Sequence, residues 1–279
     1  MREMTLIGNS PSDSAPLAIV TGSTGGFGKE FVRLLAEDGF DLLLIARDEE
    51  ALRRQAQETE QSSGRRCSIL VADLSEGAGV QKVVCCIQNV RQPVRVLVNN
   101  AGFGALGAFQ RLEPPGQMIA VNAEALAMLT HAVLPQMVAA REGLILNVAS
   151  AAAFSPGPLM ATYYATKAFV LSFSEALSEE LRGSGVRVCA FCPGPSTTGF
   201  GARAGIEGTP TFDRHALPPG RLVAIGYARA RAGQVVIVPS LRIKAMLVLS
   251  RLVPRSMVRW WMGRQLAIRA RASGVSPQS

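Results

Sequence analysis

The stretch "PLAIVTGSTGGFGKEFVRLLAEDGF", residues 16–40, indicates how the fold begins. Its first residues are apolar and of high β-propensity, as in a buried parallel strand. A run of glycines follows. The next segment has the spacing of an amphipathic helix at Phe31, Leu34 and Leu35, and Gly39 is suited to end it. A strand, a glycine-rich turn and a helix in this order are typical of an α/β sheet protein.

The turn itself reads "TGSTGGFG" from Thr21 to Gly28. Gly22, Gly26 and Gly28 let the backbone turn tightly and approach a pyrophosphate, which a helix N-terminus attracts electrostatically. The alternative is a glycine-rich turn that binds nothing. Its position directly after the first strand favours dinucleotide binding.

Strand-like and helix-like runs alternate along the rest of the chain, with no repeat and no linker before about residue 240. This alternation predicts an α/β, Rossmann-type doubly wound parallel sheet of about seven strands with helices on both faces. We expect a polar leader over residues 1–16, one domain over 17–240 and a C-terminal extension over 241–279. Ligands of such sheets bind at the carboxyl ends of the strands. The predicted strands are residues 16–22, 41–47, 67–75, 94–102, 143–153, 186–194 and 233–240.

The end of the second strand bears on the choice of dinucleotide. An arginine there pairs with the 2′-phosphate of NADP, whereas a carboxylate accepts hydrogen bonds from the ribose of NAD. Arg47 therefore favours NADP. Asp48 beside it would suit NAD if it neutralised the arginine. The third interpretation is a solvent-exposed Arg47–Asp48 pair at the start of a helix. Asp73, at the end of the third strand, suits either an adenine contact or a helix cap.

The quartet Tyr163-x-x-x-Lys167 places a phenol and an ammonium one helical turn apart. A phenol has a pKa of about 10, and a close positive charge lowers such a pKa by roughly one to three units. A tyrosine tuned in this way can exchange a proton with a carbonyl or alcohol oxygen. Tyr164, three residues before Lys167, is the alternative candidate for this tyrosine. In isolation, most such quartets are a surface lysine beside a core aromatic residue.

Two further polar residues change that reading. Ser150 ends the fifth strand, where its hydroxyl can polarise the same carbonyl. Asn122 lies within a predicted helix although asparagine is a poor helix former. Its side chain or a displaced backbone carbonyl would then serve another purpose.

Together these residues resemble the short-chain dehydrogenases/reductases, the compact NAD(P)-dependent type, over about residues 17–240. The resemblance rests on "TGSTGGFG", "NNAG" at 99–102, the four residues Asn122, Ser150, Tyr163 and Lys167, and "PGPSTT" at 193–198. It implies that Tyr163 is the general acid/base and that Lys167 holds the nicotinamide ribose and lowers the pKa of Tyr163. Ser150 would orient the substrate carbonyl, and Asn122 would hold a water in the proton relay.

The resemblance also implies a cofactor site. Asn99 would contact the cofactor, and residues 193–198 would cover the nicotinamide carboxamide. NADP is favoured and NAD is the alternative, because Ser23 and Thr24 are neutral where many NADP-using members have a basic residue. The predicted cofactor-binding residues are Gly22, Ser23, Thr24, Gly26, Phe27, Gly28, Arg47, Asp73, Leu74, Asn99, Ala101, Gly102, Tyr163, Lys167, Pro193, Gly194 and Thr198.

Five scattered cysteines and no signal peptide indicate reduced thiols in a cytoplasmic protein. Cys189 and Cys192 form a C-x-x-C within an apolar strand, and no second pair completes a zinc site, so no metal is expected. The helices around Asn122 and Lys167 have long apolar faces, which suit a homo-oligomer.

The net charge of +8 belongs to the C-terminal part, because twelve Lys/Arg and no Asp/Glu follow residue 213. The first 213 residues are net acidic, so no nucleic acid partner is expected. Residues 241–279 combine arginines with Trp260 and Trp261, which favours peripheral contact with an anionic membrane surface. A lid over the substrate site, a subunit interface and a disordered tail are the alternatives.

These features predict an NADP-dependent oxidoreductase that moves a hydride between the nicotinamide and a carbonyl or alcohol carbon. Apolar segments at 103–109, 151–160 and 197–205 would line the cleft, so the substrate would be small and hydrophobic: a lipidic ketone, a sterol or an acyl derivative. The alternative is a dinucleotide-binding sensor or scaffold without turnover, which has no need of Ser150, Tyr163 and Lys167 together.

Overall fold

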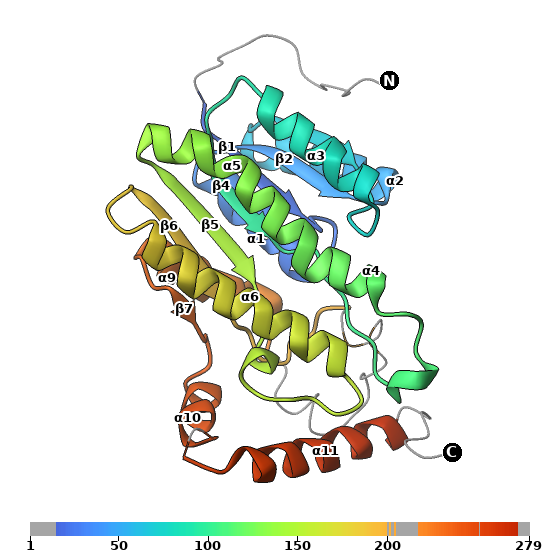
Figure 1. The fold of residues 1–279 in the computed structure, drawn as a ribbon. Coiled ribbons are helices and arrows are strands. Elements are labelled where there is room, and N and C mark those ends of the chain that lie inside the picture. Colours follow the sequence, from blue (N-terminus) through green and yellow to red (C-terminus); the bar gives the residue numbers. More distant parts are fainter. Residues whose placement is uncertain (1–14, 200, 202–203, 205–216, 251, 273–279) are drawn as a thin grey trace.

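Seven parallel strands form one sheet in the order β3-β2-β1-β4-β5-β6-β7 (Figure 1). The computed structural model describes residues 15–199, 201, 204, 217–250 and 252–272, so most of the predicted leader lies outside the described residues. The prediction of a doubly wound parallel sheet is confirmed. The strands are β1 (Leu17–Thr21), β2 (Asp41–Ala46), β3 (Cys67–Val71), β4 (Val94–Asn99), β5 (Gly143–Val148), β6 (Val186–Phe191) and β7 (Val236–Ile237).

Helices cover both faces of this sheet (Figure 1). One face is covered by α1 (Gly26–Glu37), α2 (Glu49–Ser63) and α9 (Pro219–Arg231). The other is covered by α3 (Gly77–Asn89), α5 (Leu126–Ala140) and α6 (Ala161–Glu180), with α4 (Gly116–Ile119) leading into α5. Short 3-10 turns lie at Phe109–Arg111 and Ala151–Phe154.

The core consists of alternate strand residues facing opposite ways. Ala18 and Val20 of β1 pack toward α1, whereas Leu17 and Ile19 pack toward α3 and α5. Because both faces are covered, β1 is apolar and buried throughout, as the sequence predicts for a central parallel strand.

The segment Gly116–Ala140 would also suit a membrane crossing by length and hydropathy alone. In this fold its Leu129, Val133 and Met137 are fully buried against the sheet. A core helix of a soluble domain passes the same test, so a single such segment among the described residues is a weak indication.

This segment is interrupted by a π-helical turn at Ala120–Ala125, which contains Asn122. A π-turn widens the helix and displaces backbone groups from the regular α-helical pattern. The irregularity predicted from an asparagine inside a helix is therefore present.

The C-terminal extension folds as two helices, α10 (Leu241–Ser250) and α11 (Arg255–Ala272), beyond the carboxyl ends of the strands (Figure 1). Pro254 lies between them, because proline cannot continue a helix whose backbone needs its N–H.

Candidate active site

A cavity of about 1360 Å³ lies at the carboxyl ends of the strands. It runs from the glycine loop after β1 to the C-terminal helices, and strand order reverses between β1 and β4 beside it. This switch point is where open α/β sheets bind their ligands. The predicted site residues that line the cavity are Gly22, Thr24, Gly26, Phe27, Arg47, Asp73, Leu74, Ala101, Gly102, Ser150, Tyr163, Lys167, Pro193, Gly194 and Thr198.

Two glycines in the turn after β1 have no room for a side chain. Gly22 has φ +60°, and a Cβ there would lie 2.9 Å from the Cα of Ala101. A Cβ on Gly28 would lie 2.2 Å from the Gly22 carbonyl oxygen, so Gly28 packs the helix onto the loop and does not line the cavity. Gly22 therefore shapes the cavity wall, and Gly28 lets α1 approach it.

The N-terminus of α1 opens at the cavity. Its N-cap, Gly25, provides no side-chain hydrogen bond, and the first turn contains no acidic residue. Gly25, Gly26 and Phe27 line the cavity, so the first amides of the helix lie beside it. Uncapped amides and the positive end of the helix dipole fit a pyrophosphate.

Ser23 is placed differently from the prediction. Its side chain is fully buried away from the cavity, and its Oγ has no hydrogen-bond partner among the described residues. Its carbonyl oxygen accepts a hydrogen bond of 3.0 Å from Gln55 of α2. Ser23 therefore ties the loop to α2 instead of facing the cofactor site.

Arg47, Asp48 and Asp73 meet at the far end of the cavity. Asp48 caps α2 by accepting a hydrogen bond from the Ala51 amide, so its carboxylate serves the helix. Arg47 is largely exposed, and its guanidinium lies 3.7 Å from the carboxylate of Asp73. Hydrogen bonds from Ser75, and then the charge of Arg47, lower the pKa of Asp73. Asp73, and not Asp48, is thus the acid beside the arginine.

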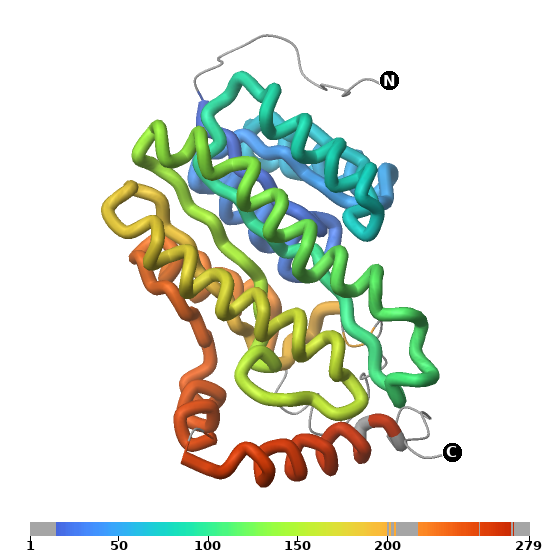
Figure 2. Tube along the Cα trace, viewed as in Figure 1, coloured from blue at the N-terminus to red at the C-terminus, as the bar shows by residue number. Residues whose placement is uncertain are grey.

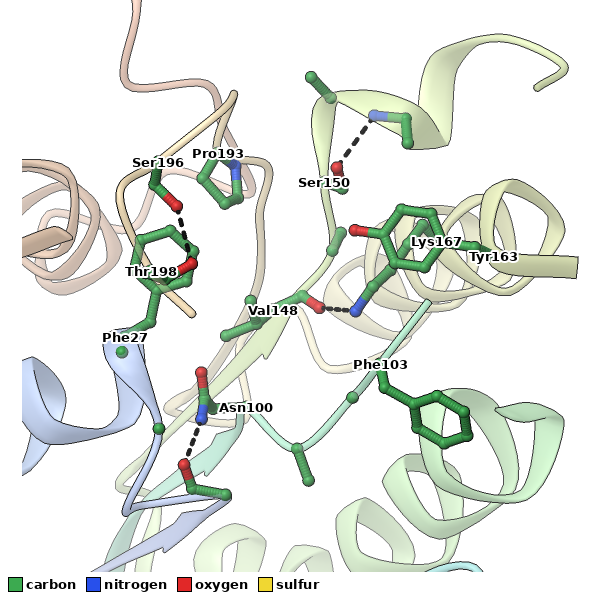
Figure 3. Close-up of a pocket in the computed structure, with 18 of the residues that line it drawn as sticks. Phe27, Asn100, Phe103, Val148, Ser150, Tyr163, Lys167, Pro193, Ser196 and Thr198 are labelled. Carbon is green, nitrogen blue, oxygen red and sulfur yellow. Dashed lines mark hydrogen bonds between the residues drawn. The ribbon is translucent and has the colours of Figure 1, made fainter. Parts of the chain in front are cut away.

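Ser150, Tyr163 and Lys167 form one wall of the cavity, from the end of β5 and the first turns of α6 (Figure 3). Ser150 lies close enough to the Tyr163 hydroxyl to lower the pKa of that tyrosine. The Oγ of Ser150 also accepts a hydrogen bond from the Ala152 amide, which fixes the start of the turn after β5. The hydroxyls of Ser150 and Tyr163 lie on the same side of this wall (Figure 3), so both face the same part of the cavity.

The Lys167 ammonium is buried below this pair. It donates a 2.7 Å hydrogen bond to the Val148 carbonyl and lies 5.9 Å from the centre of the Tyr163 ring. Burial lowers the pKa of Lys167 to about 8, and burial raises that of Tyr163 to about 12 while Ser150 opposes the rise. The predicted lowering of the Tyr163 pKa is therefore wrong for this structure, because desolvation of the phenolate outweighs the lysine beside the ring.

Asn122 lies behind the wall and not on it. Its amide oxygen accepts from the Phe103 N–H, and its amide nitrogen donates to the Phe103 carbonyl and to the Thr166 hydroxyl. A Cβ on Gly102 would lie 3.0 Å from the Asn122 oxygen and 3.4 Å from the Lys167 ammonium, so these groups are neighbours. Asn122 therefore fastens the loop after β4 to the helix that holds Tyr163.

Asn99 also lies beneath the site. Its amide donates to Thr130 and to Asn147, inside a buried network that continues to Ser174. The next residue, Asn100, lines the cavity and holds the glycine loop by donating to the Thr21 and Gly22 carbonyls (Figure 3). The Asn99 side chain, which was expected to contact the cofactor, is therefore part of this buried network, and Asn100 faces the cavity instead.

Across the cavity, Pro193, Ser196 and Thr198 face the Tyr163 wall (Figure 3). The Ser196 and Thr198 hydroxyls are 3.2 Å apart. Among the predicted apolar segments, Phe103 and Met160 line the cavity, whereas much of 197–205 lies outside the described residues.

The sequence predicts no site residue in the C-terminal helices, yet both helices contribute to the cavity. Leu266 and Ala270 of α11 are fully buried in a cluster with Tyr163 and Tyr164. The inner face of this segment therefore lies against the cavity, as expected if the segment is a lid. The C-terminal residues that line the cavity are Ser240, Arg242, Ile243, Met246, Leu247, Trp261, Met262 and Gln265.

A model of the short chain dehydrogenase family matches residues 16–206. A very-long-chain 3-oxoacyl-CoA reductase of Laccaria bicolor is 40% identical over 177 residues, which cover 61% of this chain and 52% of the relative. The 17-beta-hydroxysteroid dehydrogenase type 3 of Mus musculus is 33% identical over 215 residues, or 75% of this chain and 69% of the relative. The chain thus spans about half the length of the fungal reductase.

Among solved structures, a short-chain dehydrogenase from Sphingobium yanoikuyae in complex with NADPH superposes with a TM-score of 0.78 at 31% identity. The match covers 87% of this chain and 94% of that one, so it extends beyond the residues that the family model matches.

Proposed function

The chain belongs to the short-chain dehydrogenases, and on this premise we propose that it is an NADP-dependent oxidoreductase acting on the carbonyl or alcohol carbon of a hydrophobic substrate. One observation carries the proposal: Ser150, Tyr163 and Lys167 share a cavity wall with the uncapped helix N-terminus that suits a pyrophosphate. The nicotinamide, when bound, supplies or accepts the hydride.

The chain's own residues manage the proton and the geometry. Ser150 holds the substrate oxygen against Tyr163, and the Tyr163 hydroxyl gives its proton to that oxygen in reduction or takes it back in oxidation. Lys167 holds the nicotinamide ribose, and its ammonium favours the phenolate once the proton has moved. The Asn122 side chain holds the helix of Tyr163 against the loop at Phe103. A water of the proton relay would then bind the backbone carbonyl that the π-helical turn displaces, and not the side-chain amide.

NADP is favoured over NAD by Arg47. Asp48 is engaged in capping α2, so it does not neutralise the arginine as the sequence alone allowed. Asp73 lies nearer, but at 3.7 Å between two exposed groups the pair is weak, and a 2′-phosphate can take its place. The neighbour from Sphingobium yanoikuyae was solved with NADPH and one from Brucella melitensis with NADH, so the proposed preference rests on Arg47.

A hydrophobic substrate is favoured by the part of the cavity beyond Tyr163. Phe103, Met160, Met246, Trp261 and Met262 line it, and these side chains offer apolar surface with few hydrogen-bonding groups. The names of the relatives, a very-long-chain 3-oxoacyl-CoA reductase and a hydroxysteroid dehydrogenase, agree with an acyl or steroid ketone.

We also propose a homo-oligomer and a cytoplasmic site of action. Ile119, Met128 and Phe169 are exposed on α4, α5 and α6, and such apolar surface suits contact with a second subunit. Size measurement in solution tests the first point and cell fractionation the second.

The test of the activity is NADPH and NADH oxidation against aliphatic, aromatic, steroid and long-chain 3-oxoacyl substrates. We expect oxidation with NADPH and an apolar ketone, and a rate about 10²–10⁴-fold lower after Tyr163→Phe. Tight NADPH binding without turnover on any substrate would instead support a sensor or scaffold.

A further inference from the structure

The outer surface of the C-terminal helices is unusually apolar. Ten of the fifteen large hydrophobic residues that are exposed in the described part of the chain lie between Leu241 and Ile268. Leu252 is 80% exposed and Trp260 is 62% exposed. Figure 2 shows the backbone of these two helices at one end of the molecule, beyond the carboxyl ends of the strands.

On α11 these residues share one face. Met257, Trp260, Trp261 and Ile268 recur at helical spacing, on the side opposite the buried Leu266. On α10, Leu241, Val248 and Leu249 are exposed while Ile243 packs inward. We call these exposed residues, together with Leu252, the outer face. A helix that buries one apolar side and exposes another has two surfaces to cover.

The charge on the outer face has one sign. Residues 242–271 contain eight Lys/Arg and no Asp/Glu. Lys244, Arg255 and Arg259 are exposed, and the Arg264 guanidinium lies 4.8 Å from the centre of the exposed Trp260 ring. Apolar and aromatic side chains among basic ones suit the headgroup region of an anionic bilayer.

A second copy of the chain is a poorer match. In a two-fold dimer the same patch meets itself, so the basic residues of both copies would face each other without an acid from 242 onward to offset them. An anionic lipid surface offers both the apolar layer and the opposite charge.

The outer face continues into the cavity. Met246 and Trp261 line the cavity, yet 47% and 46% of their surfaces are exposed. Apolar side chains therefore connect the outside of the helices with the space beside Tyr163.

We propose that the outer face of α10 and α11 docks on an anionic lipid surface, and that the cavity opens toward that surface beside Met246 and Trp261. An apolar substrate dissolved in the lipid would then reach the cavity without crossing water. The docking is independent of the proposed activity, whereas this route for the substrate rests on it.

The docking test uses the full chain and vesicles of phosphatidylcholine with or without phosphatidylserine, and it needs no substrate. Both tryptophans of the protein lie on α11, so the emission of the wild-type protein reports on this helix alone. We expect a blue shift and cosedimentation with the anionic vesicles, both weakening as salt rises.

Two pairs of variants separate the contributions. Leu249→Ser/Trp260→Ser should abolish cosedimentation, whereas Phe109→Ser/Val138→Ser, at exposed apolar residues elsewhere, should leave it unchanged. Arg255→Gln/Arg259→Gln should weaken binding about thirtyfold, and Arg53→Gln/Arg54→Gln on α2 should not. Far-UV circular dichroism of each variant verifies that it is folded.

The docking proposal is overturned if the wild-type protein stays in the supernatant with anionic vesicles at low salt. It is also overturned if vesicle binding is the same with and without phosphatidylserine. A shift of the tryptophan emission with protein concentration in the absence of lipid would overturn it as well, because it would mean that a second copy of the chain covers the outer face. The route is overturned if vesicle-bound and free protein turn over a lipid-dissolved ketone equally. Failure of turnover with intact docking would count against the proposed activity only.

Discussion

Two walls enclose the same cavity and are built in opposite ways. In the Ser150–Tyr163–Lys167 wall, Tyr163 and Lys167 are buried and Ser150 is half-buried, and hydrogen bonds to nearby backbone hold Ser150 and Lys167. The wall from α10 and α11 is anchored by a few apolar side chains, such as Leu266, whereas most of the large hydrophobic residues that are exposed in the described part of the protein lie on these helices and the turn between them. The first wall is suited to one chemistry, and the second to adjustable contact with substrate and surroundings.

The largest effect expected is on the first wall. Tyr163→Phe removes the proton donor but keeps the ring, so kcat should fall about 10²–10⁴-fold while the NADPH dissociation constant changes little. Tyr164→Phe, in the same cluster, is the matched control and should keep turnover within a fewfold of wild type. If Tyr164→Phe is the inactive variant, then Tyr164 and not Tyr163 is the proton donor.

The second prediction concerns the buried charge. Burial lowers the pKa of Lys167 from 10.5 to about 8. Between these values the unfolded chain holds a proton that the folded protein lacks, so the free energy of unfolding rises with pH in this window. Lys167→Met removes this term, so its stability relative to wild type should fall by about 2 kcal/mol from about pH 8 to about pH 10.

Denaturant unfolding of the cofactor-free proteins measures this difference. The control is Lys82→Met, which removes an exposed lysine whose ammonium also donates to a strand carbonyl, that of Val71. An equal pH dependence in both variants would mean that Lys167 is no more buried than Lys82, and the contrast between the walls would lose its basis.

A smaller effect is expected at the solvent end of the cavity. Arg47→Ala should raise the NADPH dissociation constant about tenfold and leave that of NADH nearly unchanged, because a charge-assisted contact contributes about 1.5–3 kcal/mol. Isothermal titration with both nucleotides measures it. A wild type that prefers NADH would overturn the NADP assignment.

The first wall was predictable because its chemistry is local in sequence. The i, i+4 spacing of Tyr163 and Lys167 and the strand end at Ser150 determine that these groups meet. The choice between Asn99 and Asn100 was not predictable, because adjacent residues at a strand end face opposite ways and either one suits the motif.

The position of the second wall could not be predicted from the sequence, for a different reason. Arginines and tryptophans indicate a surface helix, but the burial of Leu266 and Ala270 depends on a partner cluster about a hundred residues earlier. Their i, i+4 spacing was the available signal, and it does not identify the partner. Similarly, desolvation of Tyr163 depends on the whole fold, so its raised pKa could not be predicted from the neighbouring lysine.

The central claim is that the first wall performs the chemistry and the second selects the substrate. The most direct measurement is kcat/KM with NADPH for a long-chain ketone and for a short one, in wild type, in Trp261→Ala/Met262→Ala and in the control Ile268→Ala on the same helix. We predict that the double variant loses at least about tenfold on the long substrate and less than about twofold on the short one, since only the long chain buries apolar surface there. Equal losses on both substrates, or none on either, would contradict the account.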